Sequence, residues 1–384
     1  MQSHKPQPGK GKKFLFAAIL AGASVLVALA LAEVLLRFVP VPGITYHSYY
    51  YNRVTGGRYY PNTINIYRSA RGDYVRRRIN SWGFMDDERS GAKPRGVTRI
   101  GFFGDSYTEA QQVPLDDTFV RIIQRRLNDA AGGTGPRVEC LSFGISGYSM
   151  LQSYLECRTW RERADLDWVV YVFVENDPGD QIRDVKRSAG IPYAVADGDS
   201  FDIDFSFRDR FGYKEKQPHR AFQYIKSHSL VLSTLVGRLK LLGKHGIKMR
   251  ATQEDMEMAA TGDGRRRPTT TTPPSLWPDT LRARTAALGA RVLGAWAAEV
   301  TAAGRHFAVL YMPRARELGK PYTEQDSWAE WLAAVCAEEG IELIDPSSRL
   351  LEAMANGEEV FYDHLTQDGH TAVGGAFLDY FERQ

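Results

Sequence analysis

The sequence predicts an α/β protein, with helices on both faces of a mostly parallel sheet and one membrane helix at the N-terminus. Two observations carry this prediction. From about residue 98 of the 384, short apolar runs rich in β-branched residues alternate with amphipathic segments of helical length. Near the N-terminus, Phe14–Ala32 is a run of nineteen residues without a charge, which is close to the length that spans a bilayer.

The composition is that of a globular protein and excludes several functional classes. Hydrophobic residues make up 43% of the chain and charged residues 25%, with a net charge of +3. Four of the positive charges are lysines within the first thirteen residues, so the rest of the chain is close to neutral. A near-neutral body argues against nucleic acid as the main partner, because phosphate binding requires a basic face.

The N-terminal segment predicts the location of the protein. We expect a cytoplasmic basic arm at 1–13 and a transmembrane signal-anchor at 14–38, which sends the following domain across a bacterial inner membrane to the periplasm or beyond. Cleavage of a signal peptide is the alternative, because Ala28–Ala30 and Ala30–Ala32 resemble cleavage sites. Signal peptides usually have apolar runs of about 7–15 residues, so the longer run here favours an uncleaved anchor.

Residues 39–97 are rich in Tyr, Arg and Gly and show weak periodicity, which predicts a stalk and lead-in. Their tyrosines are suited either to stacking on sugars or to ordinary packing. These tyrosines are Tyr46, Tyr49, Tyr50, Tyr51, Tyr59 and Tyr60.

The main domain is expected at 98–384, with five strands separated by helices. The third strand is apolar throughout, as in a strand buried on both faces. The expected strands are Arg99–Phe103, Arg137–Phe143, Trp168–Val174, His306–Met312 and Ile341–Ile344. The expected helices are Thr118–Ala130, Leu151–Arg163, Arg282–Ala303, Trp328–Glu339 and Thr371–Phe381.

An insertion at about 181–281 interrupts this alternation. Tyr193–Phe205 alternates around an Asp-Gly-Asp-Ser turn and predicts a β-hairpin. His228–Leu242 has helical periodicity and is expected to cover an edge of the domain or to contact the membrane. Ala251–Pro278 is expected to be a disordered surface loop.

The first predicted strand runs directly into Gly104-Asp105-Ser106, which places Ser106 as a candidate nucleophile. Ligands of open α/β sheets bind at the carboxyl ends of the strands, where this serine lies. The tripeptide is weak evidence alone, since Gly198-Asp199-Ser200 repeats it. The second copy falls in the predicted hairpin turn, where these residue types are expected, so we interpret it as structural.

The next two strand ends supply groups that acyl chemistry requires. Gly147 follows the second strand and Asn176 follows the third. A glycine amide and an asparagine side chain are suitable donors to an oxyanion. Alone, each is equally well a turn residue or a helix cap. Together with Ser106, at three consecutive strand ends, they favour a catalytic site.

A histidine near the C-terminus is the expected base. His364 precedes the final helix, in a predicted loop, with Asp363 beside it to orient the imidazole. Adjacent side chains in an extended segment point in opposite directions, so this acid needs a bend in the chain. His370 with Asp368 is an alternative pair, although His370 is expected to pack or cap at the helix start.

The sequence indicates no metal or nucleotide cofactor. It contains no H-E-x-x-H motif, no P-loop and no cluster of Cys and His. The three cysteines, Cys140, Cys157 and Cys336, include no C-x-x-C pair. A zinc ribbon and a thioredoxin-type redox site are therefore excluded.

These blocks, from Ser106 through Gly147 and Asn176 to His364, resemble the SGNH (GDSL-type) hydrolases, in particular their membrane-anchored bacterial branch. The resemblance implies a flavodoxin-like three-layer α/β/α fold with a five-stranded sheet. It also implies Ser106 as nucleophile, His364 as base, and an oxyanion hole formed by the Ser106 and Gly147 amides and the Asn176 side chain. The family usually has its aspartate two or three residues before the histidine, whereas Asp363 is adjacent.

The resemblance implies a serine esterase or an O-acyltransferase that forms an acyl-enzyme. Outside the cytoplasm, the expected substrates are O-acetyl groups on cell-envelope or exported polysaccharide, with envelope proteins as further partners. Hydrolysis of lipids or small acyl esters is a second enzymatic reading. A non-catalytic scaffold in an envelope polysaccharide complex is the alternative outside enzymology, and the irregular spacing of Asp363 and His364 is the feature that favours it.

Overall fold

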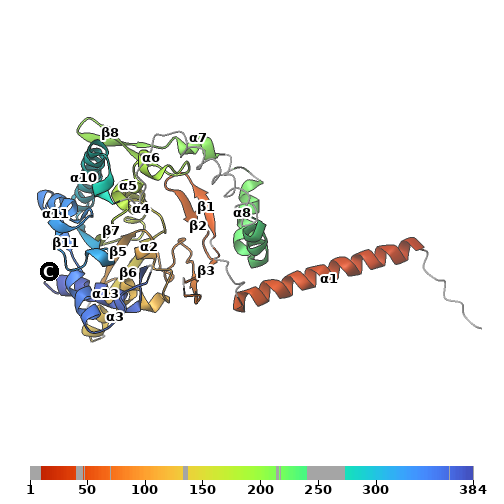
Figure 1. Ribbon diagram of the computed structural model, residues 1–384. Helices are drawn as coiled ribbons and strands as arrows, with labels where there is room; N and C mark the ends of the chain where they lie inside the picture. The colour runs from red at the N-terminus through yellow and green to blue at the C-terminus, as the bar shows by residue number, and fades with distance from the viewer. Residues whose placement is uncertain are drawn as a thin grey trace, which may run out of the picture.

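A computed structural model of the chain describes residues 10–39, 46, 48–69, 71–132, 137–212, 216, 218–239, 273–362 and 364–383. Asp363 and most of the predicted loop at 251–278 lie outside the described residues. An α/β domain holds most of the chain, and helix α1 (Lys10–Phe38) projects away from it (Figure 1). Within the described part, α1 is the one helix long and apolar enough to cross a membrane.

A five-stranded parallel sheet forms the centre of the domain and confirms the predicted fold class. Its order is β11-β10-β7-β5-β6, and each of its pairs is parallel. The chain starts in the interior at β5, adds β6 on one side, and then reverses to β7 on the other, as in flavodoxin-like sheets. The strands are β5 (Val97–Gly104), β6 (Arg137–Gly144), β7 (Trp168–Val174), β10 (His306–Met312) and β11 (Glu342–Ile344).

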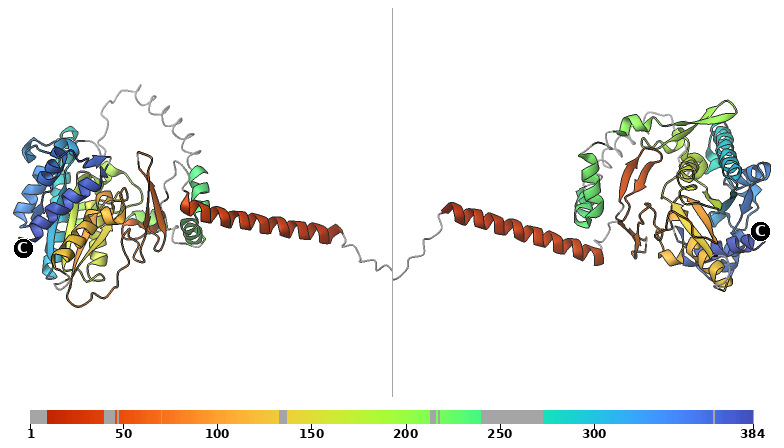
Figure 2. Two further views of the ribbon diagram at one scale, coloured as in Figure 1. Left: turned by 90° about the horizontal axis from the view of Figure 1, so that it is seen from below. Right: turned by 180° about the vertical axis from the view of Figure 1, so that it is seen from behind.

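Two layers of helices cover the sheet and enclose two apolar clusters. Along β7, Val169, Tyr171 and Phe173 join one cluster, and the alternate residues join the other. The first layer contains α4 (Met150–Trp160), α10 (Asp279–Ala302) and α11 (Ala329–Glu338). The second contains α3 (Phe119–Ala130), α12 (Ser347–Ala355) and α13 (Gln367–Phe381), of which the nine-residue α12 was not predicted. Both views of Figure 2 show the helices packed around the strands.

The prediction of a stalk within residues 39–97 was wrong. The lead-in folds into two antiparallel hairpins whose ends are buried in the main core with Tyr59, Ile79 and Phe84. Tyr46 and Tyr59 are only 3% and 0% exposed, which removes them as stacking platforms for sugars. The hairpin strands are β1 (Tyr49–Asn52), β2 (Gly56–Tyr59), β3 (Ile64–Arg68) and β4 (Tyr74–Arg78).

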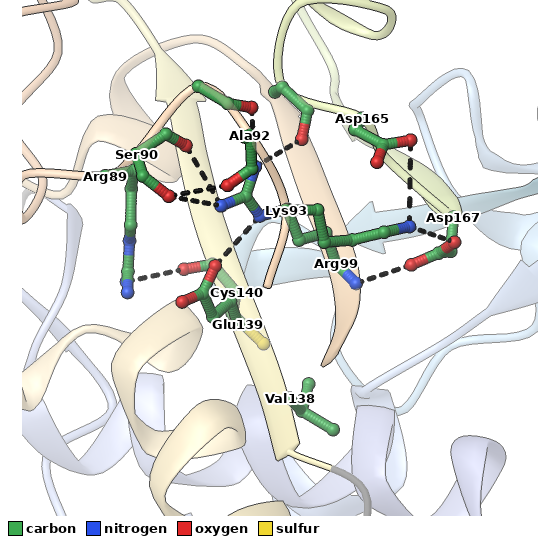
Figure 3. Close-up of polar contacts among 12 residues, drawn as sticks. Arg89, Ser90, Ala92, Lys93, Arg99, Val138, Glu139, Cys140, Asp165 and Asp167 are labelled. Atoms are coloured by element: carbon green, nitrogen blue, oxygen red, sulfur yellow. Dashed lines mark hydrogen bonds and ion pairs between the residues drawn. The ribbon is translucent and has the colours of Figure 1, made fainter. Parts of the chain in front are cut away.

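Arg99 joins the end of the lead-in to the sheet (Figure 3). Its side chain is fully buried in β5, and its Nε lies 2.8 Å from Glu139 Oε2 on β6. The guanidinium also donates to the carbonyl oxygens of Ala164 (2.8 Å) and Ser90 (3.0 Å). Nearby, Lys93 pairs with Asp167 at 2.6 Å. These contacts hold the lead-in against the amino ends of the strands.

The insertion contains the expected hairpin and the one expected helix, together with short helices that were not predicted. Gly198 occupies the hairpin turn with a φ of +54°, so the second Gly-Asp-Ser copy is a turn, as predicted. The expected helix at 228–242 is the helix Leu230–Leu239, and α8 precedes it. The remaining labelled elements here are α5 (Asp177–Asp180), α6 (Arg183–Lys186), β8 (Tyr193–Asp197), β9 (Ser200–Asp204), α7 (Phe207–Phe211) and α8 (His219–His228).

Candidate active site

Ser106 lies where β5 turns into the short helix α2 (Ser106–Glu109). Asp105 caps this helix by accepting a hydrogen bond from the Tyr107 amide at 3.0 Å. The turn requires glycine at 104, because a Cβ there would lie 2.3 Å from Thr108 Oγ1 and 2.9 Å from a backbone oxygen of β7. The local fold therefore presents a half-buried serine at the carboxyl edge of the sheet.

His364 lies within hydrogen-bond distance of this serine. Its Nε2 is 3.0 Å from Ser106 Oγ, although 258 residues separate the two positions. It belongs to β13 (His364–Leu365), which pairs with β12 (Phe361–Tyr362) in a tight hairpin, and not to the loop expected from the sequence. The Tyr107 ring lies against the imidazole at 4.9 Å. The structure thus brings together the predicted nucleophile and base.

The structure places His370 in the core. It lies within α13, where its Nδ1 accepts a hydrogen bond from the Phe119 amide at 3.4 Å. Burial, with the charges of Arg77 and His364, lowers the pKa of His370 to about 3, so the imidazole is neutral. His370 packs against helix α3. The Ser106 hydroxyl contacts His364 and not His370. Asp363 lies outside the described residues, so its role as the triad acid stays a prediction.

Two of the three predicted oxyanion donors, Gly147 and Asn176, follow the strands that flank β5. Gly147 follows β6 with a φ of +77°, and open space surrounds the position of a Cβ there. Its carbonyl oxygen accepts a hydrogen bond from Lys186 Nζ at 2.6 Å. Asn176 follows β7, and its Nδ2 donates to Asp180 Oδ2 at 3.1 Å. The amide that should face an oxyanion is therefore held by a carboxylate in this structure.

Three buried aspartates, Asp105, Asp177 and Asp180, surround this region. Burial raises the pKa of all three, and their mutual repulsion adds to the effect on Asp105 and Asp177. Lys186 offsets part of the rise in the pKa of Asp180, because its Nζ lies 2.5 Å from the Asp180 carboxylate. Asp180 and Lys186 were not predicted as part of the site. Asp180 follows Asn176 by four residues, whereas Lys186 lies in the insertion, so only tertiary contact brings it to the Gly147 loop.

Glu109 was also missed, although it lies three residues after Ser106. It is 1% exposed and accepts hydrogen bonds from the Ser146 amide (2.8 Å), the Ser146 hydroxyl and the Tyr59 hydroxyl. Burial raises the pKa of Glu109 to about 7, against the lowering effect of these donors. Because Ser146 adjoins Gly147, Glu109 fixes the loop that carries the predicted oxyanion amide.

Two cavities lie near these residues. One of about 460 Å³ borders the serine site and is lined by Tyr107, Asn176, Glu175, Arg314 and Arg316, among others. A larger one of about 890 Å³ lies between the β1–β2 hairpin and α8. Its aromatic lining is Tyr49, Tyr50, Tyr51, Tyr60 and Tyr224, and its polar lining includes Asn52, Arg53, His219, Arg220 and Gln223.

No family model and no curated protein matches this sequence. Solved structures similar to the chain include a lipolytic G-D-S-L family member from Veillonella parvula (14% identity, TM-score 0.37, 75% of this chain and 100% of that one). Others are an acetyl xylan esterase (14%, 0.38, 73% and 98%) and an acetyl-xylooligosaccharide esterase mutant from Geobacillus (11%, 0.38, 73% and 93%). These identities and TM-scores are too low to assign a function to this chain.

Proposed function

We propose that this protein is a serine esterase or O-acyltransferase that forms an acyl-enzyme on Ser106. The observation that carries the proposal is the 3.0 Å contact between Ser106 Oγ and His364 Nε2 at the carboxyl edge of a parallel sheet. A nucleophile within hydrogen-bond reach of a base is the arrangement that activates a serine. The neighbouring strand ends carry Gly147 and Asn176, which are donors suited to acyl transfer.

The proposed reaction starts with attack of Ser106 Oγ on an ester carbonyl carbon. His364 Nε2 takes the hydroxyl proton as the Oγ–carbon bond forms. Collapse of the tetrahedral intermediate breaks the ester bond, and His364 gives the proton to the departing alcohol. Water or an acceptor hydroxyl then attacks the acyl-enzyme, again losing its proton to His364, and the Ser106 oxygen leaves with that proton. Water gives hydrolysis, and an alcohol gives transfer.

The amides of Ser106 and Gly147 are the proposed donors to the oxyanion, with the Asn176 side chain as a third. Lys186 supports this arrangement, because it binds the Gly147 carbonyl and the Asp180 carboxylate that holds Asn176. It thereby links the loops after β6 and β7. Asp363 is the proposed orienting acid, from its position next to His364 in the sequence.

We propose O-acetyl groups on a polysaccharide as the substrate class. The larger cavity supports this, because partly exposed tyrosine rings beside amide and guanidinium groups suit the apolar faces and hydroxyls of sugars. Tyr50 and Tyr60 lie there with ring centroids 4.9 Å apart. Helix α1, with the lysines that precede its apolar run, supports an inner-membrane anchor with a cytoplasmic N-terminus and an external domain.

Labelling of the full-length protein in detergent with a fluorophosphonate tests the proposal. We expect wild type to be labelled, and Ser106→Ala and His364→Ala to lose the label. The matched control is Ser200→Ala, in the exposed second Gly-Asp-Ser copy, which should label like wild type. An unlabelled, folded wild type would overturn the enzyme proposal and favour the non-catalytic scaffold. Assays with acetylated polysaccharide, lipid and small acyl esters then separate the substrate classes.

A further inference from the structure

The carboxyl-terminal part of α1 holds the start of a second, shorter helix. Glu33 accepts hydrogen bonds from the backbone amides of Leu230 (2.9 Å) and Val231 (3.0 Å) and from the Ser229 hydroxyl (2.9 Å). The first amides of a helix have no acceptor within it. Glu33 therefore caps the helix Leu230–Leu239 from nearly two hundred residues away and fixes its start beside α1. Figures 1 and 2 show the insertion beside the near end of α1.

One side of this helix packs on the protein. Leu230 is 7% exposed and forms a small cluster with Tyr46, to which Leu36 of α1 also belongs. The Tyr46 hydroxyl bonds Thr234 Oγ1 at 2.7 Å. These contacts and those of Glu33 join the helix to α1 and to the lead-in.

The other side presents leucines. Leu235 is 55% exposed and Leu239 is 58% exposed. Residues four apart share a helix face, so the two leucines form one apolar stripe on the described surface. Such a stripe is available to an apolar partner outside the domain.

The depth of Glu33 in α1 identifies that partner. The uncharged run Phe14–Ala32 extends about 28 Å at about 1.5 Å per residue, close to the thickness of a hydrocarbon core of about 30 Å. Glu33 is the next residue, so it lies at the boundary between acyl chains and headgroups. The helix that it caps begins at the same level.

The charge of the segment suits an anionic bilayer surface. Residues 216–239 contain Lys216, Arg220, Lys226 and Arg238 and no Asp or Glu. Basic residues beside an apolar helix face are typical of segments that lie in the interface of anionic membranes. Phosphate headgroups therefore match these cations, and the upper acyl chains match Leu235 and Leu239.

We propose that the helix Leu230–Leu239 lies in the headgroup region of the bilayer that α1 spans, with Leu235 and Leu239 directed into the lipid. The inference rests on the proposed membrane span of α1 and is independent of the ester chemistry. The domain then has two attachments to the membrane, which restrict its rotation about α1. The serine site is held at one orientation to the membrane.

Depth-resolved quenching tests this inference. Single cysteines are placed in the full-length chain by Leu235→Cys, Leu239→Cys, Val25→Cys and Met354→Cys, and each is labelled with an environment-sensitive dye. The three native cysteines are buried, so unsubstituted protein gives the labelling background. The proteins are reconstituted in phosphatidylethanolamine–phosphatidylglycerol vesicles. The vesicles contain lipid with a nitroxide either just below the headgroup or near the bilayer centre.

Val25 reports the span of α1, and Met354 reports the opposite side of the domain. Val25 is 58% exposed within the apolar run, and Met354 is 45% exposed on α12. Helix α12 packs on α13, which lies on the side of the domain away from α1 (Figure 1). Quenching of the dye at 25 by the nitroxide near the bilayer centre shows that α1 spans the bilayer. In those vesicles, we expect the shallow nitroxide to quench the dyes at 235 and 239 strongly and the dye at 354 weakly. Dyes at 235 and 239 that are quenched no more than the dye at 354, in those same vesicles, would overturn the inference.

Discussion

At the scale of single residues, the proposed site depends on groups whose pKa or orientation is set by burial. Ser106 and His364 are half-buried and in contact, whereas the acids behind them are almost inaccessible. A buried carboxyl group resists ionisation because the low-dielectric interior disfavours its charge. The acids near Ser106 therefore act as hydrogen-bonded supports, and their substitution should have distinct effects on stability and rate.

Asn176→Ala tests the proposed oxyanion donor. Loss of one such donor is expected to lower kcat by about 10²–10³-fold with little change in KM, because the interaction forms with the transition state. The measurement is hydrolysis of a small acetyl ester by the detergent-solubilised chain. A kcat close to that of wild type would show that Asn176 only bridges to Asp180, as its contact in the structure does.

Glu109→Gln tests the buried carboxyl under the Gly147 loop. Burial raises the pKa of Glu109 from an ordinary 4.5 to about 7, so between these values the folded state keeps a proton that the unfolded state has lost. The contribution of Glu109 to stability is therefore complete below pH 4.5 and falls as the pH rises to about 7. Glutamine does not titrate, so we expect a smaller loss of stability from pH 5 to pH 7 than in wild type.

Chemical unfolding of both proteins across this pH range measures the difference. Asp105 and Asp177 also have raised pKa values and leave part of the pH dependence in the variant. An unchanged pH dependence in Glu109→Gln would contradict a raised pKa at Glu109.

At the scale of elements, the lead-in supports the sheet and lines a cavity. Its hairpins are short, and two-stranded hairpins have little stability of their own in water. They persist here because Tyr59 and Phe84 of the lead-in are buried in the core of the main domain. In addition, Arg99 of β5 binds the Ser90 carbonyl of the lead-in. The pattern of apolar residues was too weak to predict these hairpins, because the residues on which they pack lie in other parts of the chain.

Arg99→Met tests the connection between the lead-in and β5. Removal of the guanidinium leaves Glu139 and three backbone carbonyls without their partner, so a loss of about 3–5 kcal/mol of unfolding free energy is expected. The matched control is Arg349→Met. Arg349 pairs with Asp379 at 2.8 Å on the surface, where an ion pair contributes at most about 1 kcal/mol. Equal losses in the two variants would contradict a buried, structural role for Arg99.

Tyr50→Ala and Tyr60→Ala test the larger cavity as a binding site for sugars. Loss of a stacking ring is expected to raise KM for an acetylated polysaccharide several-fold, because a stacked ring contributes roughly 0.5–1.5 kcal/mol beyond its buried area. KM for a small acetyl ester, which has no sugar chain to bind in this cavity, should not change. Parallel kinetics with both substrates measure this, and equal effects on both would exclude a separate polymer site.

At the scale of the whole molecule, the protein consists of a domain and an apolar helix that points away from it. None of the apolar window of α1 is buried by the rest of the protein. Exposure of so many apolar side chains to water is unfavourable at about 25 cal/mol per Å². Insertion in a bilayer would remove this cost, and the lysines at the start of the helix are the basis of the orientation proposed above.

Alkaline carbonate extraction of membranes from expressing cells, followed by N-terminal sequencing, tests the anchor. We expect the chain to remain in the membrane fraction with its N-terminus at Met1 or Gln2. A soluble domain that begins after Ala30 or Ala32 would instead establish a cleaved signal peptide. In a separate experiment, protease added to intact spheroplasts should remove the domain if it is external.

Much of the fold and part of the candidate site follow from local sequence pattern. Strands such as Trp168–Val174 were predicted at their observed bounds, because a strand buried on both faces must be apolar throughout. Ser106, Gly147 and Asn176 were predicted because the ends of neighbouring parallel strands meet at one edge. Glu109 and Lys186 were missed as supports, because Glu109 binds Ser146 and Lys186 binds Gly147, which are 37 and 39 residues away in the chain. Asp180 was also missed, although its partners Asn176 and Lys186 lie within six residues of it.

The sequence by itself determined the α/β class, the parallel sheet, the membrane-length helix and the candidate groups at three strand ends. These features depend on local apolar periodicity and on short spacings, which are properties of the chain alone. Only the tertiary structure decided that His364 contacts Ser106 and His370 lies in the core. It also decided that the lead-in packs on the domain and that Glu33 holds the helix Leu230–Leu239. Each of these depends on contacts between distant segments, whose geometry exists only once the core has packed.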